Sequence, residues 1–126
     1  MTSFVDANVI VYAFTEHPNS GECREVLQKE DLITDTVALL EAYAKVTTIS
    51  KQAYAEKAAK TLLGLGNLRV FDFDKNLFFE AIKRNKKYKL KISDLVHYTT
   101  ALINNCEEII SYDKDFDNLE IKRIEP

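Results

Sequence analysis

The sequence predicts an α/β fold: a single domain over residues 1–126, built as a three-layer α/β/α sandwich around a mostly parallel sheet of about five strands. Short apolar runs alternate with longer amphipathic runs, which is typical of strands that alternate with helices. Strands connected in this way form parallel sheets that helices cover on both faces. The chain has 126 residues, two prolines and three glycines, so its length suits one domain and no linker divides it.

The apolar and amphipathic runs place the individual elements. Strands are predicted over residues 3–5, 32–34, 68–73, 108–111 and 121–124. Helices are predicted over residues 20–29, 36–50, 52–63, 75–88 and 94–104. Residues 8–14 fit either a helix or a continued strand, because periodicity does not separate the two over so short a run.

Polar residues mark the helix starts. Asp35 or Thr36, Asp74 and Ser93 can each cap a helix, since short polar side chains accept hydrogen bonds from free backbone N–H groups.

Composition limits the class of protein. The longest apolar run, from Val9 to Phe14, is far shorter than the roughly 20 residues that cross a bilayer. Asp6 and Asn8 interrupt any secretory signal region. Two separated cysteines are too few for a disulfide scaffold and are expected to stay reduced. We therefore expect a cytoplasmic protein with no membrane segment.

Acidic side chains gather near the ends of several predicted strands, where parallel sheets bind ligands. Asp6 follows the first strand, Glu41 lies in the helix after the second, and Asp94 opens the helix before the fourth. The fourth strand is followed by Asp113, Asp115 and Asp117.

Each acid also has an ordinary structural interpretation. Asp6 is compatible with a turn or helix cap, and Asp113 with an acidic loop. Asp94 would be favoured by the helix macrodipole, and Glu41 could pair with Lys45 one helical turn away.

A helical wheel places Glu41 at the margin of a buried face. We expect Val37, Leu40, Ala44 and Thr47 to form that face. A carboxylate beside it needs a partner to be tolerated, so this position weakens the surface-pair interpretation.

Other metal sites are less consistent with the sequence. A calcium loop that starts at Asp113 requires Gly at its sixth position and Glu at its twelfth, where this chain has Asn118 and Ile124. His17 and His97 are too few and too scattered for a zinc site, and we expect His97 to be an ordinary helix-face residue. Converging carboxylates repel one another unless a cation intervenes. Mg²⁺ suits oxygen ligands and phosphate substrates, which points to metal-assisted phosphodiester hydrolysis.

Four segments in this order resemble the PIN-domain family, and within it the VapC-type toxin ribonucleases. They are residues 4–13 (FVDANVIVYA), 40–42 (LEA), 93–101 (SDLVHYTTA) and 111–117 (SYDKDFD).

The resemblance implies a PIN-like fold and an endoribonuclease that depends on Mg²⁺ or Mn²⁺, acts on RNA, forms a homodimer and has a cognate antitoxin. The catalytic acids of the family fall on Asp6, Glu41, Asp94 and Asp113. Supporting positions fall on Asn8, Ser111 and Asp117. We expect Asp6, Asp94 and Asp113 to hold the metal and Glu41 to orient or deprotonate the attacking water.

The charge distribution bears on an RNA substrate. Seventeen Lys and Arg against 20 Asp and Glu give a net charge of −3, which at first sight argues against a nucleic-acid partner. Residues 83–91, the basic strip, nevertheless carry six positive charges and no acid: Lys83, Arg84, Lys86, Lys87, Lys89 and Lys91. The strip is either a solvated helix end or an RNA-phosphate contact leading to Asp94, with Tyr88 as a base-stacking surface.

Other functions remain open at this point. A housekeeping PIN-domain RNA-processing nuclease would use the same four acids, and a non-catalytic RNA- or protein-binding module is a more distant alternative. A phosphoacceptor receiver domain fits poorly, because it requires adjacent acids after the first strand, where Ala7 follows Asp6.

Overall fold

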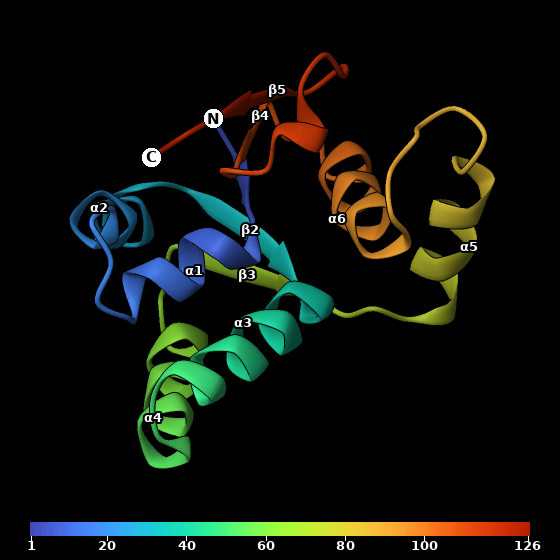
Figure 1. Ribbon diagram of the computed structural model, residues 1–126. Coiled ribbons are helices and arrows are strands. Elements are labelled where there is room, and N and C mark those ends of the chain that lie inside the picture. The colour runs from blue at the N-terminus through green and yellow to red at the C-terminus, as the bar shows by residue number, and fades with distance from the viewer.

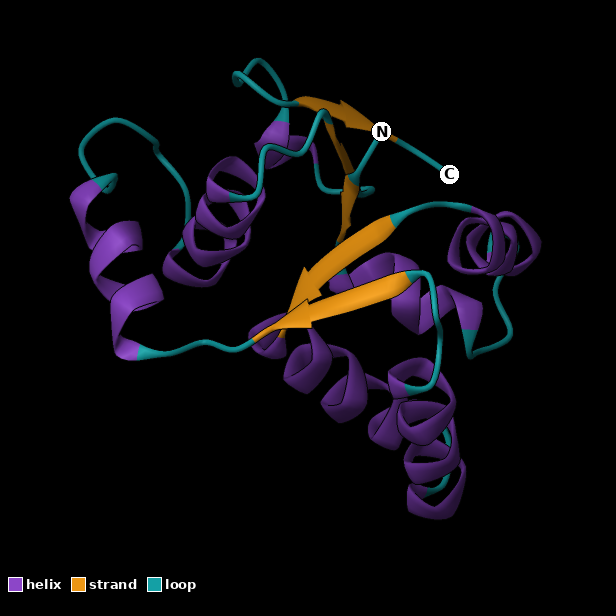
Figure 2. Cartoon of the chain, turned by 180° about the vertical axis from the view of Figure 1, so that it is seen from behind, coloured by secondary structure: helices purple, strands orange, loops and turns teal.

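The sheet at the centre of the structure has five parallel strands in the order β3-β2-β1-β4-β5. The computed structural model describes residues 1–126, apart from the side chain of Lys29. The strands span Ser3–Val5 (β1), Leu32–Asp35 (β2), Leu68–Phe71 (β3), Glu108–Ile110 (β4) and Lys122–Ile124 (β5). In Figure 2 the two strands nearest the viewer lie side by side with their arrowheads at the same end, as parallel strands do.

Six α-helices and one short 3₁₀-helix surround the sheet. They span Ala7–Ala13 (α1), Ser20–Lys29 (α2), Thr36–Ile49 (α3), Gln52–Leu63 (α4), Lys75–Lys83 (α5), Ile92–Ile103 (α6) and Lys114–Phe116 (η1). Helices α5 and α6 lie on one side of the sheet, and α1 to α4 lie on the other (Figure 1). This arrangement confirms the predicted α/β/α sandwich.

Alternation along the strands builds two separate cores. On β1, Phe4 points into the core with α5 and α6, whereas Val5 points into the core with α1 and α2. On β4, Ile109 points into the same core as Phe4, and Ile110 points into the same core as Val5. Successive side chains of a strand face opposite sides, so continuous apolar runs fit a sheet that is covered on both faces.

The strand order reverses between β1 and β4. From β1 the chain adds β2 and β3 on one side, then returns to place β4 and β5 on the other. Ligands of parallel sheets bind in the crevice that such a reversal opens at the carboxyl ends of the strands. The residues that follow β1 and β4 therefore meet at this position.

Several local predictions need correction. Residues 8–14 resolve as a helix, because the Asp6 carboxylate accepts a hydrogen bond from Ala7 N and caps α1. Helix α5 ends at Lys83, not near residue 88, since the chain turns there and buries Tyr88 against α6. Ser93 is not a cap: it lies in the first turn of α6, which begins at Ile92.

The predicted buried face of α3 is also wrong. Leu40 is 68% exposed, whereas Ala38, Ala42 and Val46 are buried. Helix α3 packs against α1 and α4, and small alanine side chains allow that close approach. Within the described residues, no helix combines the length and apolar character needed to cross a membrane.

Candidate metal centre

Asp6 lies at the strand reversal and is almost completely buried. Its backbone N–H donates to Ile110 O on β4 at 3.0 Å. One carboxylate oxygen caps α1 through Ala7 N at 2.8 Å, and the other accepts from the Ser111 hydroxyl at 2.6 Å. Asp6 is therefore a helix cap through one oxygen, while its other oxygen joins it to the segment that follows β4.

Asn8 and Ser111 hold the loop after β4 against Asp6. The Ser111 hydroxyl accepts from Asp113 N at 2.9 Å. Asn8 donates from Nδ2 to Ser111 Oγ at 3.4 Å, and its Oδ1 accepts from Tyr112 N at 3.4 Å. These contacts connect the start of α1 to the segment that follows β4.

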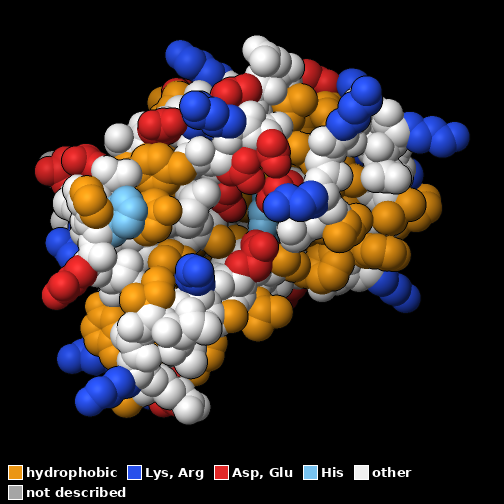
Figure 3. All heavy atoms as spheres, viewed as in Figure 1, with side chains coloured by type: hydrophobic (Ala, Val, Ile, Leu, Met, Phe, Trp, Pro, Cys, Tyr) orange, Lys and Arg blue, Asp and Glu red, His pale blue; other side chains and the backbone are white. Residues whose placement is uncertain are grey.

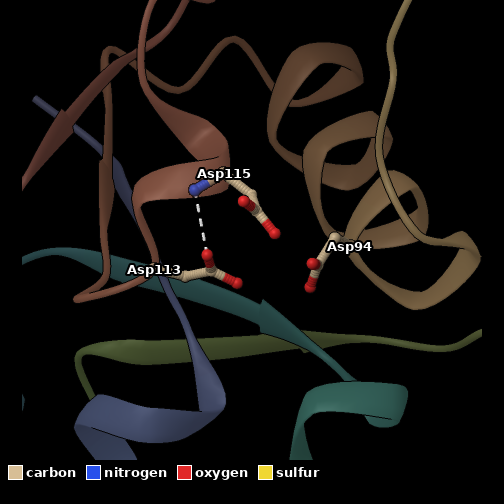
Figure 4. A group of neighbouring side chains, drawn as sticks. All are labelled: Asp94, Asp113 and Asp115. Carbon is tan, nitrogen blue, oxygen red and sulfur yellow. Dashed lines mark hydrogen bonds between the residues drawn. The ribbon is translucent and has the colours of Figure 1, made fainter.

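Three carboxylates face one another beside this network. Asp94, Asp113 and Asp115 each offer an oxygen, and these oxygens all lie within 4.8 Å of one another. Figure 4 shows the three side chains pointing toward a common space, Asp94 from α6 and the other two from the η1 segment. Asp94 Oδ2 is buried and has no hydrogen-bond partner among the described residues. We call these three residues with Asp6 the acidic cluster.

The arrangement fits a divalent cation with oxygen ligands. Buried polar atoms in proteins nearly always have a partner, and Asp94 Oδ2 has none within the described chain although it faces two further carboxylates. A hard cation is the partner that such a donor set accepts.

The pKa values of the buried acids reflect the same lack of compensating partners. Burial, followed by the charges of Asp6 and Asp113, raises the pKa of Asp94 from 3.8 to about 6. Burial also raises the pKa of Asp6, although the charge of His97 and the Ser111 hydrogen bond oppose this shift. Both carboxylates are therefore less stable as anions here than in water.

Two acids lie differently from their sequence predictions. Asp115 joins the cluster, although the sequence analysis noted it only among the acids after the fourth strand and did not assign it to the site. Asp117 instead pairs with Arg123 at 2.6 Å, so it holds the η1 segment to β5.

Glu41 contacts His97, so the alternative interpretation as a surface pair with Lys45 does not apply. Its Oε1 lies 2.7 Å from His97 Nε2, and His97 Nδ1 lies 2.8 Å from Asp35 Oδ2. His97 is fully buried, which corrects the expectation of an ordinary helix-face residue. Burial alone would lower its pKa, but the hydrogen bonds to Asp35 and Glu41 outweigh burial and raise the pKa of His97 to about 10. His97 and Asp35 are the site residues that the sequence analysis missed.

Three of the six cations of the basic strip pair with two neighbouring acids, which offset two of its six charges. Lys83 and Arg84 both pair with Glu80, and Lys87 pairs with Glu120 at 2.8 Å. Three cations of the strip have no ion pair among the described residues: Lys86, Lys89 and Lys91.

Tyr88 cannot stack on a base in this structure. It is 5% exposed and its hydroxyl bonds to Glu120. The strip therefore offers charge but no aromatic platform.

One face of the molecule combines these charges. Figure 3 shows Asp and Glu side chains gathered at its middle, with a histidine side chain visible between them and a Lys or Arg side chain beside them. An acidic cluster bordered by cations suits an anionic substrate that reaches a bound metal ion.

The fold and this acidic cluster define an α/β domain with a candidate metal centre at the strand reversal. The sequence model of the PIN domain family matches residues 3–122. The chain therefore belongs to the PIN-domain family. No curated protein matches the sequence.

Solved structures with a similar fold include toxins and toxin–antitoxin complexes. VapC20 of Mycobacterium tuberculosis, a sarcin-ricin loop cleaving toxin, has a TM-score of 0.80 at 15% identity over 98% of this chain and 99% of that chain. VapBC2 of Rickettsia felis, bound to a promoter DNA fragment, has a TM-score of 0.75 at 16% identity over 99% and 98%. A toxin–antitoxin complex from Klebsiella pneumoniae has a TM-score of 0.73 at 15% identity over 97% and 95%. At these identities, the likeness establishes the fold.

The raised pKa of Asp94 gives a stability prediction. The folded protein binds this proton more tightly than the unfolded chain, so its free energy of unfolding falls as pH rises from about 4 to about 6. Asp94→Asn removes the buried charge and should raise the free energy of unfolding at pH 7 by about 1–2 kcal/mol in EDTA. This gain is below the ~3 kcal/mol of two pKa units because the asparagine amide that replaces the carboxylate is also a buried polar group without a partner.

Urea denaturation at pH 7 and pH 4 measures the effect, with Asp115→Asn at the exposed member of the cluster as the matched control. The gain should disappear at pH 4 and be smaller for Asp115→Asn. Destabilisation by Asp94→Asn at pH 7 would contradict the assignment.

Proposed function

We propose that this chain is a metal-dependent endoribonuclease that hydrolyses RNA phosphodiester bonds, and that it is the toxin of a VapBC-type toxin–antitoxin pair. The observation that carries the proposal is the acidic cluster at the strand reversal, in which the buried Asp94 Oδ2 faces further carboxylates without a partner of its own. Membership of the PIN-domain family supports nuclease chemistry.

Different residues of the chain have different roles in the proposed reaction. Asp6, Asp94 and Asp113 would hold Mg²⁺ or Mn²⁺, and Asp115 adds a fourth carboxylate from the exposed side. When bound, such an ion supplies charge stabilisation at the phosphoryl group and a more acidic water. Asn8 and Ser111 keep Asp6 and the loop at Asp113 in register.

Glu41 stands at the margin of the cluster. Its charge is close enough to raise the pKa of Asp6, while its side chain remains 41% exposed. A carboxylate placed there can orient the attacking water or accept its proton.

The proposed partners follow from the relatives. VapC20 is a toxin that cleaves the sarcin-ricin loop, and the Rickettsia and Klebsiella structures are toxin–antitoxin complexes. We infer an RNA substrate, a cognate antitoxin and a homodimer for this single domain of residues 1–126, acting in the cytoplasm.

Removal of one carboxylate tests the activity. Asp6→Asn keeps an oxygen that can cap α1 but weakens the metal site, so cleavage should fall by more than about 100-fold. The assay is cleavage of a panel of structured RNAs with Mg²⁺, Mn²⁺ or EDTA, with circular dichroism to verify the fold. Glu56→Gln, at an exposed position on α4, is the matched control and should cleave like wild type.

Growth of cells that express the protein distinguishes a toxin from a housekeeping nuclease. Expression of wild type should arrest growth and expression of Asp6→Asn should not. Cleavage by Asp6→Asn at the wild-type rate would refute the proposed site.

The unpaired cations of the basic strip generate a binding prediction. Lys86→Gln with Lys89→Gln should weaken RNA binding and flatten the plot of log affinity against log salt by about 0.7 for each lost phosphate contact. Binding is measured in the non-cleaving Asp6→Asn background by fluorescence anisotropy across salt concentrations. The control pair Lys57→Gln with Lys60→Gln lies on α4, away from the cluster. An unchanged slope in the strip variant would remove the strip from the RNA path.

A further inference from the structure

His97 connects the buried core to Glu41. It lies on α6 one turn after Asp94, so one helix carries an acid of the cluster and the histidine behind it. Both ring nitrogens of His97 lie within 3.0 Å of a carboxylate oxygen. Its Nδ1 contacts the carboxylate of Asp35, and its Nε2 contacts the carboxylate of Glu41. Asp35 and Glu41 belong to the start and the second turn of α3, so His97 links two elements that are far apart in sequence.

The contacts require a doubly protonated ring. An ionised carboxylate only accepts hydrogen bonds, and a neutral imidazole donates from one nitrogen alone. With a carboxylate on each side, a neutral ring would place two acceptors in contact. An imidazolium donates in both directions, in agreement with the raised pKa of His97.

Asp35 fixes the orientation of the His97 imidazolium. It is completely buried, and its Oδ1 caps α3 through Ala38 N at 2.8 Å. Its Oδ2 accepts from the Thr100 hydroxyl at 3.2 Å in addition to His97. The ring of Phe4 packs against the imidazole with centroids 5.5 Å apart. The imidazolium is thus fixed by a carboxylate that is itself fixed at a helix terminus.

Glu41, in contrast, has a long and partly exposed side chain. A glutamate side chain has several rotatable bonds and loses rotamer entropy when it is fixed in one geometry. A bond of 2.7 Å to a rigid cation removes this freedom before substrate arrives. Preorganisation of a reacting group contributes to rate in this manner.

We propose that His97 is a positioning residue: anchored by Asp35, it fixes the Glu41 carboxylate so that one oxygen is bound to the ring and the other is available to the attacking water. This inference rests on the proposed nuclease activity and deepens it. Of the two roles considered for Glu41, it favours orientation of the water. The same cation lies near Asp6 and Asp94 and offsets part of the repulsion in the acidic cluster.

Two variants of similar size separate the two hydrogen bonds of the ring. An asparagine amide reaches about as far as Nδ1, so His97→Asn keeps a donor for Asp35 and loses the one for Glu41. A glutamine amide reaches about as far as Nε2, so His97→Gln keeps a donor for Glu41. His97→Asn should lower kcat by about 10–100-fold with little change in KM, and His97→Gln should retain more activity.

A double-mutant cycle with Glu41→Gln distinguishes positioning from general support of the fold. If His97 acts through Glu41, His97→Asn should have no further effect in the Glu41→Gln background. Independent, multiplying losses would overturn the proposal, as would wild-type kcat in His97→Asn. Inactivity of wild type with every RNA and metal would refute the nuclease proposal instead.

Nitrogen NMR tests the geometry without any variant. The chain has two histidines, so the ring signals are readily assigned. Both nitrogens of His97 should be protonated at pH 7.5, since Asp35, Glu41 and Asp6 surround the ring with negative charge and the Thr100 hydroxyl adds none. A neutral ring at this pH would overturn the proposal even if His97→Asn failed to fold.

Discussion

Repulsion among carboxylates at the end of β1 and β4 is the constraint on which the rest of the site depends. Asp6 and Asp94 are buried, and burial raises the pKa of both. A fold selected only for stability would place apolar groups or paired charges there. Two of the four acids also stabilise local structure: Asp6 caps α1, and Asp113 caps η1.

The strand topology positions the acidic cluster, and a nearby positive charge offsets part of the repulsion within it. Reversal of strand order between β1 and β4 brings Asp6 beside the loop at Ser111 and Asp113. His97 contributes one buried positive charge from behind the cluster. The net charge of −3 therefore does not describe the surface that an RNA would meet, because acids gather at the middle of one face (Figure 3) and Lys91 lies close enough to lower the pKa of Asp94.

Local pattern predicted the fold and singled out three acids that the structure brings close together, because alternating apolar runs and acids after strands are properties of neighbouring residues. Asp6 and Asp94 illustrate this, since their positions follow from strand ends and helix starts. The sequence could not distinguish Asp115 from Asp117, because Arg123 of β5 draws Asp117 away. It also missed His97, whose partner Asp35 is 62 residues distant. Burial of Tyr88 and the true face of α3 likewise depend on which elements pack together, and periodicity in one segment does not specify that.

The central claim is that the acidic cluster binds a divalent cation, and thermal unfolding with added Mn²⁺ measures this directly. An ion that binds only the folded chain stabilises it by RT ln(1 + [L]/Kd), so the Tm of metal-free wild type should rise steadily across roughly 0.01–10 mM Mn²⁺. The Tm of Asp94→Asn should rise far less over the same range. Equal shifts in the two proteins, or no shift in wild type at the highest concentration, would contradict the account.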